Sequence, residues 1–176
     1  MDVSGSMTQN RKYLARSFFF LLYHFIRCKY ENIELVFLAH DTHAYEVNED
    51  KFFHRGSAGG TMVSSVYEKQ LEIINERYHP DTWNIYSFHC SDGDNWRSDN
   101  LKTVSLISLL KEICQIVGYC EINDSLSDDS WFVDKDKLAN VLDSLEDDKF
   151  RISLIGKKED VWPQFSKLFG GKYDLK

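Results

Sequence analysis

The stretch Met1-Asp2-Val3-Ser4-Gly5-Ser6-Met7 decides how the rest of the chain is interpreted. Its oxygen-bearing side chains, those of Asp2, Ser4 and Ser6, stand at alternate positions. A strand that leaves its sheet and turns sharply at Gly5 can direct all three toward one point. Carboxylate and hydroxyl oxygens are the hard ligands that Mg²⁺ prefers in an octahedral arrangement. The stretch therefore favours a metal site, although short strings of Asp, Ser and Gly also occur in ordinary turns.

Two later pieces, Gly59-Gly60-Thr61 and Ser91-Asp92-Gly93, each place turn-forming glycine beside one oxygen ligand. Together the three pieces resemble the von Willebrand factor type A domain. The metal-ion-dependent adhesion site (MIDAS) of that domain reads Asp-x-Ser-x-Ser, then a distant Thr, then a distant Asp that is usually followed by Gly. The ligands that this resemblance implies are Asp2, Ser4, Ser6, Thr61 and Asp92.

Three further stretches narrow the resemblance: residues 15–20 (ARSFFF), 36–40 (VFLAH) and 88–95 (FHCSDGDN). They are similar to stretches of the bacterial YhbH/YeaH (UPF0229) family, which is associated with sporulation and stress. The similarity covers residues 1–123. It implies an adaptor that works with a serine protein kinase of the AAA+ type and with SpoVR-type proteins. It also implies that a Glu or Asp of the partner completes the metal coordination, so that binding requires Mg²⁺ or Mn²⁺.

The composition predicts a soluble globular protein that binds neither nucleic acid nor membranes. With 176 residues, 43% of them hydrophobic, the chain is long enough for one domain with a sizeable core. A net charge of −7 lacks the basic surface that phosphate binding needs. No apolar run reaches the roughly 20 residues of a membrane-spanning helix. The four cysteines have no CxxC spacing and no secretory signal precedes them, so reduced thiols in a cytoplasm are expected, without zinc.

Hydrophobic periodicity predicts helices that alternate with strands. The expected helices are 8–30, 63–78, 98–114, 135–145 and 159–169, with a polar loop at 48–60. The expected strands are 33–39, 43–47, 83–90, 116–122 and 150–155. This order is typical of an α/β fold with a doubly wound, mostly parallel sheet and helices on both faces, of the von Willebrand A or Rossmann-like kind. Ligands of such sheets bind beyond the carboxyl ends of strands, where Asp2–Ser6 and Asp92 are expected.

One feature departs from the family pattern, in which a buried strand runs into the Asp-x-Ser-x-Ser motif. Only Met1 precedes Asp2 here, so the first central strand is expected to be largely missing. The chain is then either a fragment of a longer protein or a natural truncation, and the neighbouring strands lose main-chain partners. We expect a single domain over residues 1–176, in which an acidic helix-strand-helix segment at 124–176 completes the family-like core at 1–123.

The predicted function is non-catalytic: a divalent-cation-dependent, protein-binding adaptor in a bacterial cytoplasm. Phosphatases of the haloacid dehalogenase type are an alternative, because the stretch Gly93-Asp94-Asn95-Trp96-Arg97-Ser98-Asp99 resembles their distant motif. Their second Asp is replaced by Ser4, however, which removes a general acid worth roughly 10²–10⁴-fold in rate. A degenerate domain with a purely structural role and no metal is the third possibility. Asp99 could instead cap the helix that follows it.

Two further groups of polar residues lie close to the predicted site. A predicted strand is followed by His40, Asp41 and His43. These residues could form a second metal cluster, but Asp and His at the end of a strand are more often solvated turn residues. Ser6 or Thr8 could cap the first helix. The unpaired amides of that helix would lie near the metal and suit an acidic ligand.

Overall fold

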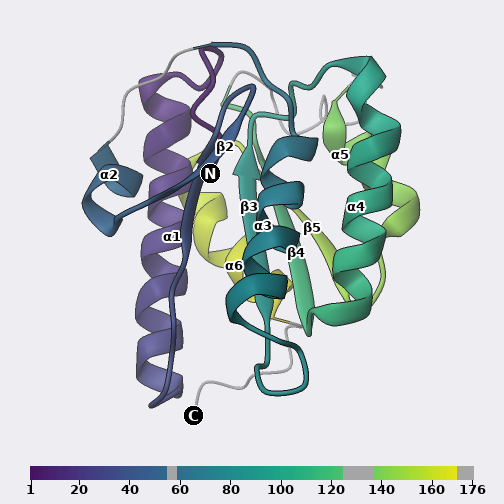
Figure 1. The fold of residues 1–176 in the computed structure, drawn as a ribbon. Helices are drawn as coiled ribbons and strands as arrows, with labels where there is room; N and C mark the ends of the chain where they lie inside the picture. Colours follow the sequence, from purple (N-terminus) through teal and green to yellow (C-terminus); the bar gives the residue numbers. More distant parts are fainter. Residues whose placement is uncertain (55–58, 125–136, 170–176) are drawn as a thin grey trace.

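The computed structural model describes residues 1–54, 59–124 and 137–169, in which helices and strands alternate along most of the chain (Figure 1). The α-helices are α1 (Gln9–Lys29), α2 (Glu49–His54), α3 (Ser64–Arg77), α4 (Asn100–Ile113), α5 (Leu138–Leu142) and α6 (Val161–Leu168). The strands are β1 (Phe37–His40), β2 (Ala44–Val47), β3 (Tyr86–Ser91), β4 (Ile116–Ile122) and β5 (Phe150–Ile155). Short 3₁₀ turns are η1 (Arg97–Asp99), η2 (Asp143–Leu145) and η3 (Lys158–Asp160).

Strands β3, β4 and β5 form a parallel sheet in this order. Cys90 of β3 lies opposite Cys120 of β4, which lies opposite Ser153 of β5. The central strand β4 is buried along almost its whole length, as expected for a parallel strand covered on both faces. A mixed α/β fold with a parallel sheet flanked by helices is therefore confirmed.

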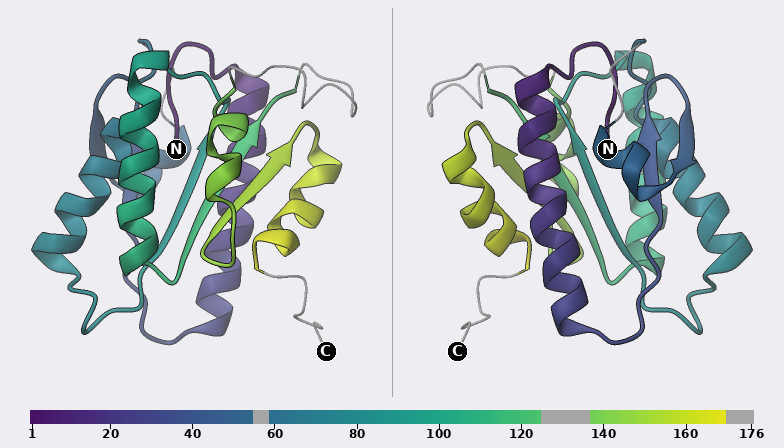
Figure 2. Two further views of the ribbon diagram at one scale, coloured as in Figure 1. Left: turned by 90° about the vertical axis from the view of Figure 1, so that its right-hand side faces the viewer. Right: turned by 90° about the vertical axis from the view of Figure 1, so that its left-hand side faces the viewer.

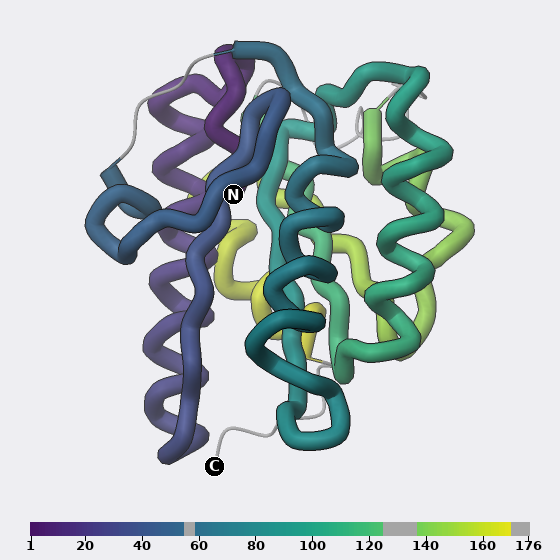
Figure 3. The backbone as a smooth tube through the Cα atoms, in the orientation of Figure 1, coloured from purple at the N-terminus to yellow at the C-terminus, as the bar shows by residue number. Residues whose placement is uncertain are grey.

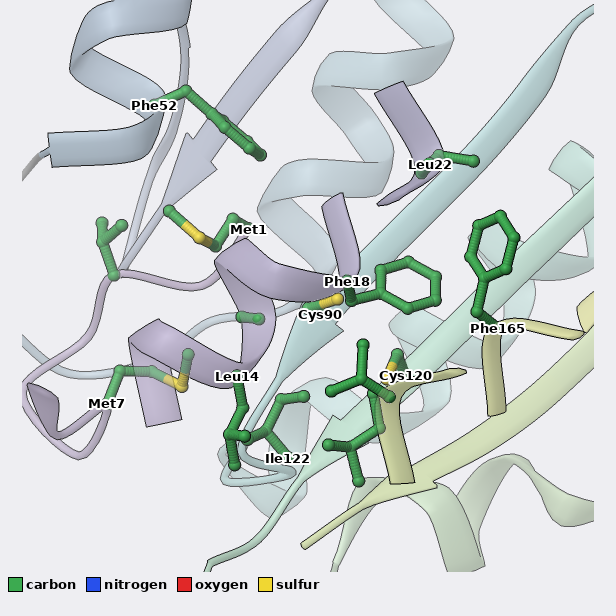
Figure 4. Close-up of a cluster of buried hydrophobic side chains, with 14 of the residues drawn as sticks. Met1, Met7, Leu14, Phe18, Leu22, Phe52, Cys90, Cys120, Ile122 and Phe165 are labelled. Carbon is green, nitrogen blue, oxygen red and sulfur yellow. The ribbon is translucent and has the colours of Figure 1, made fainter. Parts of the chain in front are cut away.

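Helices cover both faces of this sheet (Figure 2). Because successive side chains of a strand point to opposite faces, β4 contributes to two separate cores. Val117 and Tyr119 belong to the core on the side of α3, α4 and α5. Ile122 belongs to the core on the side of α1 and α6, where Phe18 and Phe165 meet edge to face with ring centroids 6.0 Å apart (Figure 4).

The β1–β2 hairpin is a second, antiparallel sheet, and among the described residues the main-chain hydrogen bonds that link it to the first sheet come from residues 1–3. The Asp2 N–H donates to the Cys90 carbonyl of β3 at 2.9 Å, and the Val3 N–H donates to the His40 carbonyl of β1 at 2.8 Å. The His40 N–H returns a bond to the Met1 carbonyl at 3.2 Å. Residues 1–3 therefore lie as a short parallel strand between β1 and β3, and Figure 3 shows them alongside the hairpin.

A cavity of about 520 Å³ continues the line of these three residues between β1 and β3. Its walls include residues 32–38 and 82–89, and α1 and α3 contribute further apolar side chains such as Phe19 and Ile73. The expected continuous, doubly wound sheet is thus seen as two sheets with a partly filled gap between them.

Several predicted boundaries were wrong. The first strand begins at Phe37 rather than at residue 33, and the predicted polar loop at 48–60 contains α2. This helix has a cap, because the Lys51 N–H donates to the Asn48 side chain at 2.9 Å, and Phe52 buries itself against Phe37. The helix predicted at 135–145 is the shorter pair α5 and η2, with residues 135–136 outside the described chain.

Two further predicted helices correspond to a 3₁₀ turn followed by an α-helix. The helix predicted at 159–169 is η3 followed by α6, and the one predicted at 98–114 is η1 followed by α4. The predicted acidic segment at 124–176 can be followed only in part, because residues 125–136 and 170–176 lie outside the described residues. None of the helices in the described ranges combines the length and apolar character that crossing a bilayer requires. The division into a core at 1–123 and a segment at 124–176 stays a prediction.

Candidate metal centre

The Asp-x-Ser-x-Ser segment forms a tight turn after its three strand-like residues. The Ser4 N–H donates to Asp2 Oδ1 at 2.8 Å, and the Ser4 and Ser6 hydroxyl oxygens lie 3.1 Å apart. The other carboxylate oxygen of Asp2 accepts a bond from the Ser91 hydroxyl at 2.8 Å. Asp2 is fully buried, and its carboxylate holds the turn through these two hydrogen bonds.

Asp92 follows the carboxyl end of β3 and turns toward the same point. The Ser6 hydroxyl hydrogen-bonds to its carboxylate, and the Asp94 N–H donates to its Oδ1 at 3.2 Å. Asp92 is fully buried. The structure therefore brings Ser4, Ser6 and Asp92 together, and Asp2 is joined to them through the Ser4 amide.

Thr61 lies in a neighbouring loop that is tied to the turn. The Gly5 N–H donates to the Gly59 carbonyl at 2.9 Å, and a Cβ at Gly5 would lie only 3.2 Å from that oxygen. Thr61 is buried. Among the described residues, no hydrogen bond joins its hydroxyl to Ser4, Ser6 or Asp92.

The loop after Asp92 holds the start of α3. Asn95 Oδ1 accepts the Val63 N–H at 3.0 Å, and Asp99 Oδ2 accepts the Ser64 N–H at 2.9 Å. Asp99 does stand at the N-cap position of α4, but its side chain makes no capping bond to the α4 backbone. Asp99 Oδ2 instead accepts the Thr103 hydroxyl at 3.1 Å as well as the Ser64 N–H of α3. The bonds to the Val63 and Ser64 amides tie the segment of Thr61 to the segment of Asp92. Thr8 caps α1 as one of the two predicted possibilities, with its hydroxyl 3.2 Å from the Arg11 amide nitrogen.

Two carboxyl groups of the site, those of Asp2 and Asp92, are buried. Burial raises the pKa of Asp2 and, with the added repulsion from Asp2 and Asp94, that of Asp92. A cation does stand beside Asp92, since Arg11 Nη1 lies 2.9 Å from Asp92 Oδ2. The two buried carboxylates and the converging hydroxyls are oxygen donors of the kind that fits Mg²⁺, whereas the guanidinium beside them is a counter-charge and not a ligand.

The site differs from metal centres built from acids and imidazoles. No group of three or more His, Cys, Asp or Glu side chains is gathered for a metal in the described part of the chain. The candidate set contains only two such residues, Asp2 and Asp92. A cation held here would depend on hydroxyl oxygens and water for its remaining ligands, which agrees with the several waters that Mg²⁺ usually keeps.

Comparison with known proteins identifies the family. The family model described as "Protein of unknown function (DUF444)" matches residues 1–172. The chain belongs to this family. A UPF0229 protein of Ruminiclostridium cellulolyticum is 54% identical over 173 residues, which cover 96% of this chain and 41% of that protein. A UPF0229 protein of Bacillus cereus is 43% identical over 169 residues, with the same two shares. The predicted UPF0229 membership is confirmed, and the chain spans about two fifths of these relatives.

The interpretation of His40 in this DUF444 chain needs correction. His40 Nε2 lies 2.7 Å from His89 Nε2, and the other ring nitrogen of His89 bonds to the Tyr67 hydroxyl at 2.9 Å. Burial lowers the pKa of His40 to about 3, so the ring is neutral in the fold. Asp41 instead closes a turn by accepting the His43 N–H at 3.1 Å. His40 is thus a fully buried core residue, whereas Asp41 and His43 belong to the turn that follows it.

Two residues that hold the Asp92 loop were not predicted from the sequence. Glu121, at the end of β4, lies against Gly93 and accepts the Ala139 N–H at 2.8 Å. Burial raises the pKa of Glu121 to about 7. Lys137 donates to the Asp92 carbonyl at 2.9 Å. Only the charge of Glu121 within an apolar strand could have marked it in the sequence.

Proposed function

We propose that this chain is a non-catalytic, protein-binding domain of the von Willebrand factor A type that depends on a divalent cation. The cation is Mg²⁺ or Mn²⁺, and its ligands are Asp2, Ser4, Ser6, Thr61 and Asp92. Asp2 binds it through water, because both of its carboxylate oxygens already accept hydrogen bonds from the protein. The observation that carries the proposal is the meeting of buried Ser4, partly buried Ser6 and buried Asp92 at the ends of strands. Chain segments 86 or more positions apart supply these oxygens, which an ordinary turn does not require.

The roles follow from the chemistry of the groups. The hydroxyls of Ser4 and Ser6 supply neutral oxygen ligands, and Asp2 and Asp92 supply the charge that a dication needs. Thr61, which lies on the loop whose Gly59 carbonyl accepts the Gly5 N–H, is the remaining ligand that we propose. A Glu or Asp of the partner takes the remaining position, so that partner binding requires the cation.

The partner classes and the setting come from the resemblance to the YhbH/YeaH family. They are a serine protein kinase of the AAA+ type and SpoVR-type proteins, in a bacterial cytoplasm. The same proposal includes an apolar strand that runs into Met1 in longer members of the family and joins the two sheets into one doubly wound sheet. The cavity between β1 and β3 supports this, because it continues the hydrogen-bonding line of residues 1–3.

A phosphatase of the haloacid dehalogenase type fits less well. In such an enzyme the Asp of the first motif is the nucleophile and must reach the substrate. Both carboxylate oxygens of Asp2 accept hydrogen bonds from the protein, one from the Ser4 amide and one from the Ser91 hydroxyl, and the residue is fully buried. Asp2 is thus placed to hold a turn rather than to attack a phosphate.

Isothermal titration with Mg²⁺ tests the proposal. The chain is compared with Asp92→Ala and with Asp148→Ala, which removes the same charge from an exposed position. We expect binding by the chain and by Asp148→Ala, and loss of at least about tenfold in affinity in Asp92→Ala. Equal affinity in all three removes Asp92 from the site. A folded chain that does not bind Mg²⁺ or Mn²⁺ favours the purely structural domain.

A further inference from the structure

Arg11 occupies the centre of the candidate site although it is not one of the predicted ligands. It lies in the first turn of α1, and only 14% of its side chain is exposed. Its Nη1 donates to Asp92 Oδ2 at 2.9 Å and to the Ser6 carbonyl at 3.2 Å. Its Nε donates to Asp124 Oδ1 at 2.9 Å. One guanidinium thus joins Ser6 of the Asp-x-Ser-x-Ser segment, the Asp92 loop and Asp124 just after β4.

The contact between Arg11 and Asp92 has an electrostatic reason. A carboxylate without exposure to water needs a counter-charge, and the Arg11 guanidinium supplies one to the Asp92 side chain at 2.9 Å. The oxygen that accepts this bond belongs to a predicted metal ligand. A dication at Asp92 and a guanidinium on the same carboxylate repel each other strongly in a buried place.

We propose that Arg11 is an internal competitor of the divalent cation for Asp92, and that it sets the affinity and the cation selectivity of the site. The inference rests on the proposed function of the site. Asp124 keeps the displaced guanidinium nearby, because it accepts bonds from both Arg11 and Asn10, the latter at 2.7 Å. A monovalent cation gains too little at Asp92 to displace Arg11, whereas a dication carries twice the charge.

Titration of Arg11→Gln with Mg²⁺ tests this proposal. The matched control is Arg27→Gln, which removes the same charge from the last turn of the same helix, where Arg27 lies over the Tyr23 ring. We expect Arg11→Gln to bind Mg²⁺ at least about tenfold more tightly than the unmodified chain, since close charge pairs are coupled by that much or more. Arg27→Gln should stay within about twofold.

A thermal melt keeps the test informative if Arg11→Gln is unstable. Without metal this variant should melt below the unmodified chain, and saturating Mg²⁺ should raise its melting temperature by more than it raises that of the unmodified chain. Arg11→Lys retains the charge and should resemble the unmodified chain in Mg²⁺ affinity more closely than Arg11→Gln does.

The outcomes separate the two claims. Tighter binding by Arg11→Gln supports the competition. Equal or weaker binding by Arg11→Gln, with Mg²⁺ still bound by the unmodified chain, refutes the role of Arg11 and leaves the metal site intact. Absence of Mg²⁺ binding in both folded chains refutes the metal site and the competition with it.

Discussion

Replacement of Gly93 by alanine should destabilise the protein by about 2–5 kcal/mol. Gly93 has φ +81°, where a side chain adds about 1–2 kcal/mol of strain. An added Cβ would also collide with the carboxylate of Glu121. Glu121 cannot move aside freely, because the Ala139 N–H and the Tyr119 hydroxyl donate to its Oε2 at 2.8 Å and 3.2 Å. Overpacking of this kind costs about 1–3 kcal/mol more.

Urea denaturation measures the effect, and Gly59→Ala is its matched control. Gly59 has φ +84°, but its added Cβ would meet nothing closer than 3.6 Å, so only the conformational strain of about 1–2 kcal/mol is expected there. In a Glu121→Ala background, the loss caused by Gly93→Ala should fall to the same value. Equal losses for Gly93→Ala and Gly59→Ala in the natural background would show that the carboxylate of Glu121 does not press on this loop.

Two other predictions concern Glu121 and the cavity. The pKa of Glu121 in the fold is about 7, above its usual value of 4.5. Its contribution to stability is therefore full below pH 4.5 and is lost as the pH rises through 7. Glu121→Gln should flatten this part of the plot of unfolding free energy against pH, and an unchanged plot would contradict the assignment. About five apolar residues joined to Met1 should raise the free energy of unfolding by about 2 kcal/mol or more by filling the cavity. A polar extension of equal length should not, and equal effects of both extensions would show that the cavity does not take a strand.

The sequence predicts best where one local pattern suffices. The strand at 116–122 was placed to the residue, because a continuous apolar run between two helices has few other interpretations. Helix α2 was missed because its cap, Asn48, and its two acidic residues look like a polar loop until Phe52 is seen to pack against Phe37. Local polarity does not reveal which aromatic side chain a distant strand will cover.

Some residues of the candidate site could likewise be predicted from the sequence, and others could not. Asp2, Ser4 and Ser6 could be grouped from their spacing, and Asp92 from its position after a strand. Arg11 could not be found, because on a helix with many basic residues nothing distinguishes the one whose guanidinium meets a carboxylate 81 positions away. The pairing of His40 with His89 is equally invisible, since it depends on two strands brought together by residues 1–3.

The charges around the site give the proposed metal dependence a physical reason. Asp2, Asp92 and Asp124 carry three negative charges, and Arg11, which contacts two of them, carries one positive charge. Lys12 and Lys137 also lie near these carboxylates. An incoming carboxylate placed beside Asp92 would meet its negative charge at short range, and a dication bound there would offset that charge and offer a position for the incoming group. An acidic partner would thus need the cation, and Arg11, by opposing the cation, would set the concentration at which the partner binds.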